Sequence, residues 1–320
     1  MLDKNKIDVL SEISAQMKQA LSLSKEHSVS LGADASLEQM RAAYEAERRF
    51  WNEGGAEMAK SREASFEFDG KRLGLRLHYP SDTPCGAIFF IHGGGWVLGS
   101  LDTHDRMART LAKHANAVTI AVDYSLAPET KYPTQINECV AAARHVIAHA
   151  DSFDLSDDKF ALFGDSAGAN LCLASQLMLR QNEPELADKF KALLLFYGIY
   201  GLKGSVSQSL LGGEWDGLSA ADIEYYYDMY LSFPKERSDS LVNIFNADLS
   251  GLPASFIASC EFDPLKDDSR LLFEILKRRG RSEYREYKGV LHAFLHYTKT
   301  LDTANEALKD AGEFVRAAFI

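Results

Sequence analysis

Cysteine is scarce in this chain of 320 residues, and no two cysteines stand at the short spacing that zinc sites and redox motifs use. The four cysteines are scattered as Cys85, Cys139, Cys172 and Cys260. This pattern predicts neither a metal site nor a disulfide framework. It favours free thiols that are mostly buried.

Long apolar runs and an excess of positive charge are also missing. The first twelve residues lack the apolar core of a signal peptide, and no apolar run approaches the ~18 residues of a membrane span. The net charge is -11, because 46 acidic residues outnumber 35 basic ones. Phosphate binding needs clustered Lys and Arg, so this balance argues against nucleic acid and membranes as partners. We expect a cytoplasmic protein that acts on a small molecule.

Short apolar runs that alternate with amphipathic segments predict a mostly parallel central sheet flanked by helices. The runs resemble strands buried on both faces, and they are 87–91, 118–122, 160–163, 193–196 and 255–258. The helices expected between them lie at 104–115, 136–149 and 170–180. Phe66–Phe68 and Leu73–Tyr79 are expected to form an antiparallel hairpin just before the sheet. The sequence therefore predicts an α/β fold.

Two further segments are expected to form a helical cap on an α/β domain that spans 61–320. Residues 1–60 are predicted to be helical, with a capping box that starts at Ser36. One apolar face is expected to carry Leu10, Ile13, Met17 and Leu21. Residues 201–250 contain the aromatic run 225–230 and interrupt the strand rhythm. Packing of these aromatics on the sheet is the alternative to a cap over the carboxyl ends of the strands, where such sheets bind ligands.

The segment Gly164–Gly168, Gly-Asp-Ser-Ala-Gly, fits the pattern of a nucleophile elbow. It stands between a predicted strand and a predicted helix, and its glycines permit the sharp turn that would expose the hydroxyl of Ser166. The same residues also look like the nucleophile segment of trypsin-like proteases, Gly-Asp-Ser-Gly-Gly. Neither interpretation gives Asp165 a role.

Three consecutive glycines follow the predicted strand 87–91, and they predict an oxyanion hole. In His92-Gly93-Gly94-Gly95 the peptide N–H groups are not obstructed by side chains. We expect Gly94, Gly95 and the N–H of Ala167 to be the donors, and His92 to shape the loop rather than transfer protons. A phosphate-binding loop is the alternative, but no Lys-Ser/Thr pair and no Gly-x-Gly-x-x-Gly frame is present.

A serine nucleophile needs a histidine base. His292 follows a predicted strand at 284–287, where an α/β-hydrolase places its histidine, and it is the predicted base. His296 is the nearest competitor and is better explained by the helix expected to follow. The poorer candidates lie in the hairpin or on helical segments with surface-like spacing: His78, His104, His114, His145 and His149.

The base in turn needs a carboxylate. Asp263 stands at the carboxyl end of the predicted strand 255–258 and is the favoured acid. Glu261, Asp267 and Asp268 are the alternatives, the last two being expected to cap the following helix. The resulting chain order, Ser, Asp, His, is that of α/β-hydrolases, whereas trypsin-like proteases have the order His, Asp, Ser.

Taken together, these motifs resemble the hormone-sensitive-lipase-like branch of the α/β-hydrolase esterases. The similarity runs from Tyr44–Asn52 to the C-terminus, and its further motifs are His92–Arg106, Gly164–Gly168, Leu210–Gly217, Glu261–Leu265 and Leu291–Phe294. One departure is visible, because the branch often has Asp-Tyr-Arg-Leu-Ala-Pro-Glu where Ser125 here replaces the arginine. That substitution puts one structural contact in doubt.

The resemblance implies a serine carboxylesterase for short-chain acyl esters, acetyl to butyryl, with a cap at the N-terminus and with no metal or organic cofactor. The family's nucleophile, acid and base fall on Ser166, Asp263 and His292, and its oxyanion donors on Gly94, Gly95 and Ala167. The alternatives are an amidase or lactonase with the same triad, or a binding or regulatory protein on a hydrolase scaffold. Regulatory relatives usually lack a triad member, so the complete triad favours an enzyme. A homodimer and a protein partner stay open.

Overall fold

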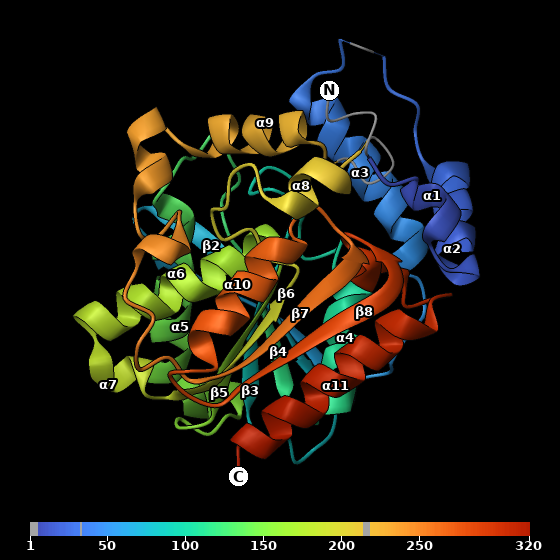
Figure 1. Ribbon diagram of the computed structural model, residues 1–320. Coiled ribbons are helices and arrows are strands. Elements are labelled where there is room, and N and C mark those ends of the chain that lie inside the picture. Colours follow the sequence, from blue (N-terminus) through green and yellow to red (C-terminus); the bar gives the residue numbers. More distant parts are fainter. Residues whose placement is uncertain (1–5, 33, 214–217) are drawn as a thin grey trace.

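The protein was examined as a computed structural model, which describes residues 6–32, 34–213 and 218–320. At its centre lies an eight-stranded sheet in the order β1-β2-β4-β3-β5-β6-β7-β8 (Figure 1). The strands are β1 (Lys60–Phe68), β2 (Lys71–Tyr79), β3 (Ala87–Ile91), β4 (Val118–Asp123), β5 (Phe160–Asp165), β6 (Phe190–Phe196), β7 (Ala254–Phe262) and β8 (Ser282–Leu291).

All pairs from β4 to β8 are parallel, whereas β1–β2 and β2–β4 are antiparallel. The predicted parallel sheet and the hairpin before it are therefore confirmed. Every residue of β3 is buried, because its side chains alternate between two apolar cores. Phe89 and Ile91 belong to the core under α5 and α6, while Ile88 and Phe90 belong to the core under α4 and α11.

Helices cover both faces of the sheet. Those in the connections between parallel strands are α4 (Asp105–Ala115), α5 (Thr134–Ala148), α6 (Ala167–Asn182), α7 (Pro184–Ala187) and α10 (Lys266–Leu276), and α11 (Asp302–Ala318) follows the last strand. Short 3-10 turns add η2 (Ala150–Phe153), η3 (Pro234–Ser238), η4 (Ile244–Asn246) and η5 (Phe294–Tyr297). Figure 1 shows α4 and α11 together on one side of the sheet, with α5, α6 and α10 on the other.

The N-terminal segment is helical, as α1 (Val9–Glu12), α2 (Ala15–His27) and α3 (Leu37–Asn52). The capping box at the start of α3 is confirmed, since Ser36 and Gln39 exchange side-chain and backbone hydrogen bonds. Of the expected apolar face, Ile13 and Met17 are buried and Leu21 packs against the core, whereas Leu10 is 45% exposed and Val9 is buried instead. The chain is extended at Ile13 before Ser14 caps α2, so one helical period does not run through the segment.

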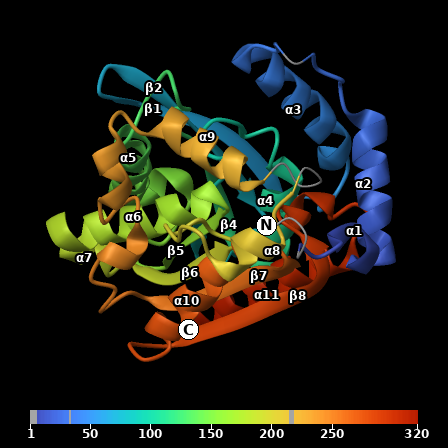
Figure 2. The same ribbon diagram turned by 45° about the horizontal axis from the view of Figure 1, so that its top comes forward.

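Helices from two distant parts of the chain lie at the carboxyl ends of the parallel strands. Residues of α3 and of α9 (Ala220–Tyr230) line the pocket that contains Ser166, and Figure 1 shows α8 (Val206–Leu210) at the same end of the sheet. Figure 2 gives the second view of these helices. The predicted motif Leu210–Gly217 ends outside the described residues.

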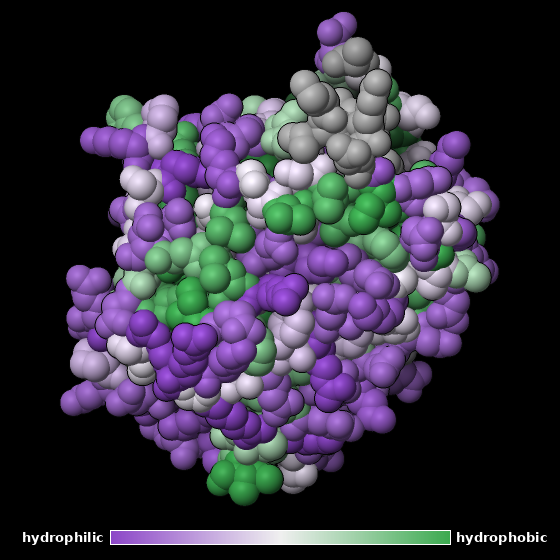
Figure 3. Space-filling model, in the orientation of Figure 1, coloured by the Kyte–Doolittle hydropathy of each residue, from purple (hydrophilic) through white to green (hydrophobic). Residues whose placement is uncertain are grey.

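Within the described ranges, no helix combines the length and the apolar character that crossing a membrane requires. The face seen in Figure 3 is largely hydrophilic, and its apolar side chains form separate patches, one of them over α8, where Val206 is 68% exposed.

Candidate active site

Ser166 sits on the sharp turn between β5 and α6. Its φ of 53° and ψ of -118° are unusual for a residue with a side chain, so the surrounding structure holds the turn in a strained conformation. Glycine is required on both sides. A Cβ on Gly168 would lie 2.0 Å from the carbonyl oxygen of Ile91, and one on Gly164 would lie 2.3 Å from the backbone of Gly168. The strand–turn–helix expected around Ser166 is present.

The structure brings three of the predicted residues into one hydrogen-bonded chain. His292, which follows β8, has Nε2 2.9 Å from Ser166 Oγ. Its Nδ1 lies 2.9 Å from Oδ2 of Asp263, which is fully buried after β7. The other oxygen of Asp263 accepts the backbone N–H of Leu265. When Nδ1 is protonated, His292 donates to Asp263 and can accept the hydroxyl proton of Ser166 at Nε2.

The three alternative carboxylates lie elsewhere. Glu261 accepts from the N–H of Gly289. Asp267 accepts from the N–H of Ser207, and Asp268 from the three consecutive N–H groups that begin at Tyr200. The expectation that Asp267 and Asp268 cap their own helix is wrong, because their oxygens bind the segment that follows β6 instead.

The buried carboxyl of Asp268 has a raised pKa. Burial raises it to about 7, although the hydrogen bonds from the backbone at Tyr200, Leu202 and Gly201 act in the opposite direction. The nearby charge of Asp263 raises it further. Asp268 lies on α10 and binds the start of the segment that carries α8 and α9. Its carboxyl therefore titrates near neutral pH.

The glycine loop after β3 lies against the same pocket as Ser166. Gly94 and Gly95 have φ values of 113° and 62°, which favour glycine. Both line the pocket together with Ala167, the first residue of α6, whose N–H has no intrahelical acceptor. A Cβ on Gly95 would lie 2.3 Å from the ring of Tyr226 on α9. The three residues expected to donate hydrogen bonds to the oxyanion therefore line the same pocket.

His92 is buried at the base of this loop. Its Nδ1 lies 2.8 Å from the carbonyl oxygen of Gly93, and its own carbonyl accepts from the hydroxyl of Tyr124. Burial, helped by the charge of His104, lowers the pKa of His92 to about 3. The imidazole is neutral at physiological pH, which suits a residue that shapes the loop.

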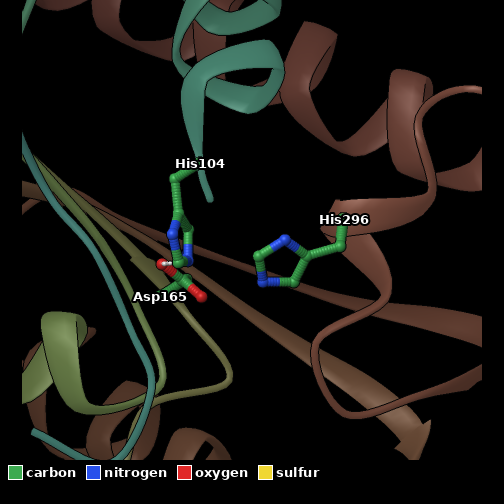
Figure 4. Close-up of side chains that lie close together, drawn as sticks. All are labelled: His104, Asp165 and His296. Carbon is green, nitrogen blue, oxygen red and sulfur yellow. Dashed lines mark ion pairs between the residues drawn. The ribbon is translucent and has the colours of Figure 1, made fainter. Parts of the chain in front are cut away.

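Asp165, to which no role was assigned from its sequence position, joins the glycine loop to the elbow. Its Oδ1 accepts the N–H of Gly93 at 2.9 Å and lies 3.7 Å from Nε2 of His104 (Figure 4). Burial raises the pKa of Asp165, but the charge and hydrogen bond of His104 and the Gly93 N–H outweigh it, and the pKa is lowered. The surface-like position expected for His104 is wrong, since it is buried beside Asp165. His296, which was expected in the following helix, lies in the 3-10 turn η5 and is buried at the same place.

His104, Asp165 and His296 are the described residues that come nearest to a metal site, with one ligand atom of each within 4.8 Å of the others. The pKa of His296 is far below its usual value, chiefly because of burial and then because of the positive charge of Arg48. That charge would repel a metal cation at the same place. Asp165 is also engaged by Gly93 and His104. We therefore describe the cluster as a buried polar network.

The serine substitution noted in the sequence is compensated by its neighbours. The hydroxyl and the N–H of Ser125 both donate to Glu138 at 2.6 Å. Lys71 Nζ lies 3.5 Å from the same carboxylate and hydrogen-bonds to Ser125. Lys71 thus brings the positive charge that the missing arginine would have supplied.

A cavity of about 110 Å³ opens beside Ser166, and helices from two distant parts of the chain line it. The wall includes Tyr44 and Arg48 from α3, and Ile223 and Tyr226 from α9. None of these four was predicted as a site residue. Two signals pointed near them, the family motif Tyr44–Asn52, which contains Tyr44 and Arg48, and the aromatic run 225–230, which contains Tyr226.

Comparison with known proteins agrees with this geometry. The family model described as alpha/beta hydrolase fold matches residues 88–296. The acetyl esterases of Salmonella choleraesuis and Salmonella dublin are both 41% identical over 319 residues, which cover 99% of this chain and 98% of each relative.

Two solved structures add to these relatives. A hyperthermophilic esterase from Pyrobaculum calidifontis has a TM-score of 0.87 and 28% identity, covering 96% of this chain and 98% of its own. EstE1, a carboxylesterase cloned from a metagenomic library, has a TM-score of 0.86 and 30% identity, covering 91% and 100%. The chain therefore belongs to the family with the alpha/beta hydrolase fold, as a homologue of the bacterial acetyl esterases.

Proposed function

We propose that this protein is a serine carboxylesterase that hydrolyses short-chain acyl esters, acetyl to butyryl, through an acyl-enzyme on Ser166. The observation that carries the proposal is the hydrogen-bonded chain from Asp263 through His292 to Ser166, with both links at 2.9 Å. The names of the Salmonella relatives support an acetyl ester as the substrate.

The reaction follows from the positions of these groups. His292, oriented by Asp263, takes the hydroxyl proton as Ser166 attacks the ester carbonyl, and then gives that proton to the leaving alcohol. Water repeats the sequence on the acyl-enzyme. The oxyanion would be held by the N–H groups of Gly94, Gly95 and Ala167, each worth about 2.7 to 4 kcal/mol in the transition state. The amino terminus of α6 also favours negative charge at this point.

The volume of the cavity supports short acyl groups. About 110 Å³ is available beside Ser166, and Leu218, Ile223 and Tyr226 close its apolar side. A longer acyl chain would have to displace them. In this proposal the segments 1–60 and 201–250 act as a helical cap on the catalytic domain 61–320, because α3 and α9 both contribute to the wall.

The test replaces the nucleophile. Ser166→Ala should lower kcat/KM for p-nitrophenyl acetate by at least about a thousandfold, while the melting temperature stays close to that of the wild type. Ser156→Ala, at an exposed turn, is the matched control and should keep full turnover. The wild type should hydrolyse acetate and butyrate esters with a higher kcat/KM than octanoate esters. Undiminished turnover in Ser166→Ala would refute the mechanism. Faster hydrolysis of octanoate, or of matched amides, would refute the substrate class.

A further inference from the structure

A buried arginine from the N-terminal segment lies in the wall of the Ser166 pocket. The side chain of Arg48 is only 11% exposed, and it lines the same cavity as Ser166 and His292. Among the described residues that line this cavity, Arg48 alone carries a permanent positive charge. Burial of a guanidinium is costly unless hydrogen bonds compensate for the lost water. The guanidinium of Arg48 is therefore expected to have hydrogen-bond acceptors at this position.

The contacts of Arg48 with the described chain leave part of its guanidinium unused. Its Nε and Nη1 atoms are buried without a hydrogen-bond acceptor in the described ranges. Oε2 of Glu47 lies 3.2 Å from Nη1, an ion pair that lacks hydrogen-bond geometry. The other oxygen of Glu47 accepts from the indole N–H of Trp51. The guanidinium carbon lies 4.7 Å from the centroid of the Tyr44 ring, which fixes the orientation of the group.

Two of the polar groups beside Arg48 are neutral. Burial, followed by the charge of Arg48, lowers the pKa of His296 far below its usual value, so its imidazole is uncharged. Burial raises the pKa of Tyr44, so its hydroxyl keeps its proton. The Tyr44 oxygen lies 3.5 Å from Nε2 of His296. Two carboxylates are also near, because Glu47 pairs with Nη1 of Arg48 and Asp165, whose pKa is lowered, lines the same cavity.

We propose that Arg48 binds a carboxylate of the substrate, so that the preferred esters of this enzyme carry a carboxylate in their acyl part or in their alcohol part. A guanidinium with free N–H groups matches the geometry of a carboxylate, and such charge-assisted hydrogen bonds are strong in a buried site. The chain as a whole has a net charge of -11, so attraction for an anionic ester has to come from a local cation. The inference rests on the proposed esterase function and narrows its substrate class.

The experiment compares esters in pairs of equal shape, with an isopropyl group in place of the carboxylate. Monomethyl succinate against methyl 4-methylpentanoate tests a carboxylate in the acyl part. 3-Acetoxypropanoate against 3-methylbutyl acetate tests one in the alcohol part. In at least one pair, kcat/KM of the wild type should be about tenfold or more higher for the carboxylate ester, because hydrogen bonds to charged groups contribute that much. The pair that shows the preference identifies the part of the ester that contacts Arg48.

Three variants link this preference to Arg48. Arg48→Met should lower the carboxylate-to-neutral ratio about tenfold to a hundredfold, and Arg48→Lys should give an intermediate ratio, since it keeps the charge and loses the planar fork. Arg49→Met removes the exposed neighbouring arginine on the same helix and should leave the ratio as in the wild type.

Each outcome either supports or overturns the proposed role of Arg48. A wild-type ratio at or below one in both pairs overturns the proposal, as does an unchanged ratio in Arg48→Met. If Arg48→Met does not fold, the wild-type pairs and Arg48→Lys decide. If the proposed esterase mechanism itself is wrong, Ser166→Ala will still hydrolyse p-nitrophenyl acetate, and this result does not depend on the Arg48 variants. An inactive Ser166→Ala with unchanged ratios in the Arg48 variants would refute only the role of Arg48.

Discussion

The site is built from two regions that hold their residues in different ways. The strand-end group, Ser166, Asp263, His292 and the loop Gly93–Gly95, follows β5, β7, β8 and β3 and is fixed by hydrogen bonds and by close backbone contacts. The helical wall, Tyr44, Arg48, Ile223 and Tyr226, comes from α3 and α9, and its side chains shape the cavity. In the proposed function, the strand ends carry out the chemistry and the side chains of the wall select the ester.

The largest effect is expected in the strand-end group. Asp263→Asn should lower kcat for every ester by on the order of 10⁴, because an amide favours the wrong tautomer of His292. The ratio between acetate and octanoate esters should not change, since the wall is untouched. Steady-state kinetics on both esters measures this, with the exposed Asp157→Asn as control. A change in the ratio would show that the two regions are not separable.

A smaller effect is expected in the helical wall, on the preference between esters instead of on kcat for all of them. Tyr226→Ala should raise the octanoate-to-acetate ratio of kcat/KM about tenfold, because it opens the apolar side of the cavity. Tyr225→Ala is the matched control, since its side chain does not line the cavity. Loss of kcat on all esters with an unchanged ratio would instead place Tyr226 with the strand-end group, through its contact with Gly95.

Where the two regions join, at Asp268, the expected effect is on the stability of the fold and not on the choice of ester. Its pKa is about 7 in the folded protein, against about 4 when unfolded, so between these values the folded state binds more protons. The free energy of unfolding should therefore fall as pH rises from 4 to 7, by up to about 1.4 kcal/mol per pH unit from this group. Asp268→Asn lacks this titration, and urea unfolding at several pH values should show a correspondingly smaller fall. Equal pH dependence in both proteins would contradict the assignment.

Most of the sheet could be predicted because its central strands are buried on both faces and appear as apolar runs. The ends of β7 and β8 extend beyond the predicted 255–258 and 284–287. Exposed and buried residues alternate along β8, so its half-exposed ends look like a loop.

Ser166, Asp263 and His292 could be predicted from chain order and from their places after strands, and the structure brings them together. The errors concern polar residues whose partners are distant in sequence. His104 looked like a surface residue because nothing local indicates that it meets Asp165. Asp268 looked like a helix cap because its backbone donors lie 66 to 68 residues away. Arg48 was not predicted as a site residue, because the other residues of the cavity wall are distant from it in sequence.

The segment that carries α8 and α9 enters between β6 and β7, which are hydrogen-bonded neighbours in the sheet. Because the two strands are parallel, the segment has to return from the carboxyl end of β6 to the amino end of β7, and α8 and α9 lie in this crossover. Their length and sequence can vary without a change in strand register. For protein engineering, this makes the insertion an exchangeable module. Grafting the corresponding segment of another esterase would change half of the cavity wall while the hydrogen bonds from Asp263 to Ser166 keep their geometry. The N-terminal segment is a second such module, but Lys6 and Ile7 donate hydrogen bonds to the carbonyls of Gly212 and Leu210, so the two segments would have to be grafted as a matched pair.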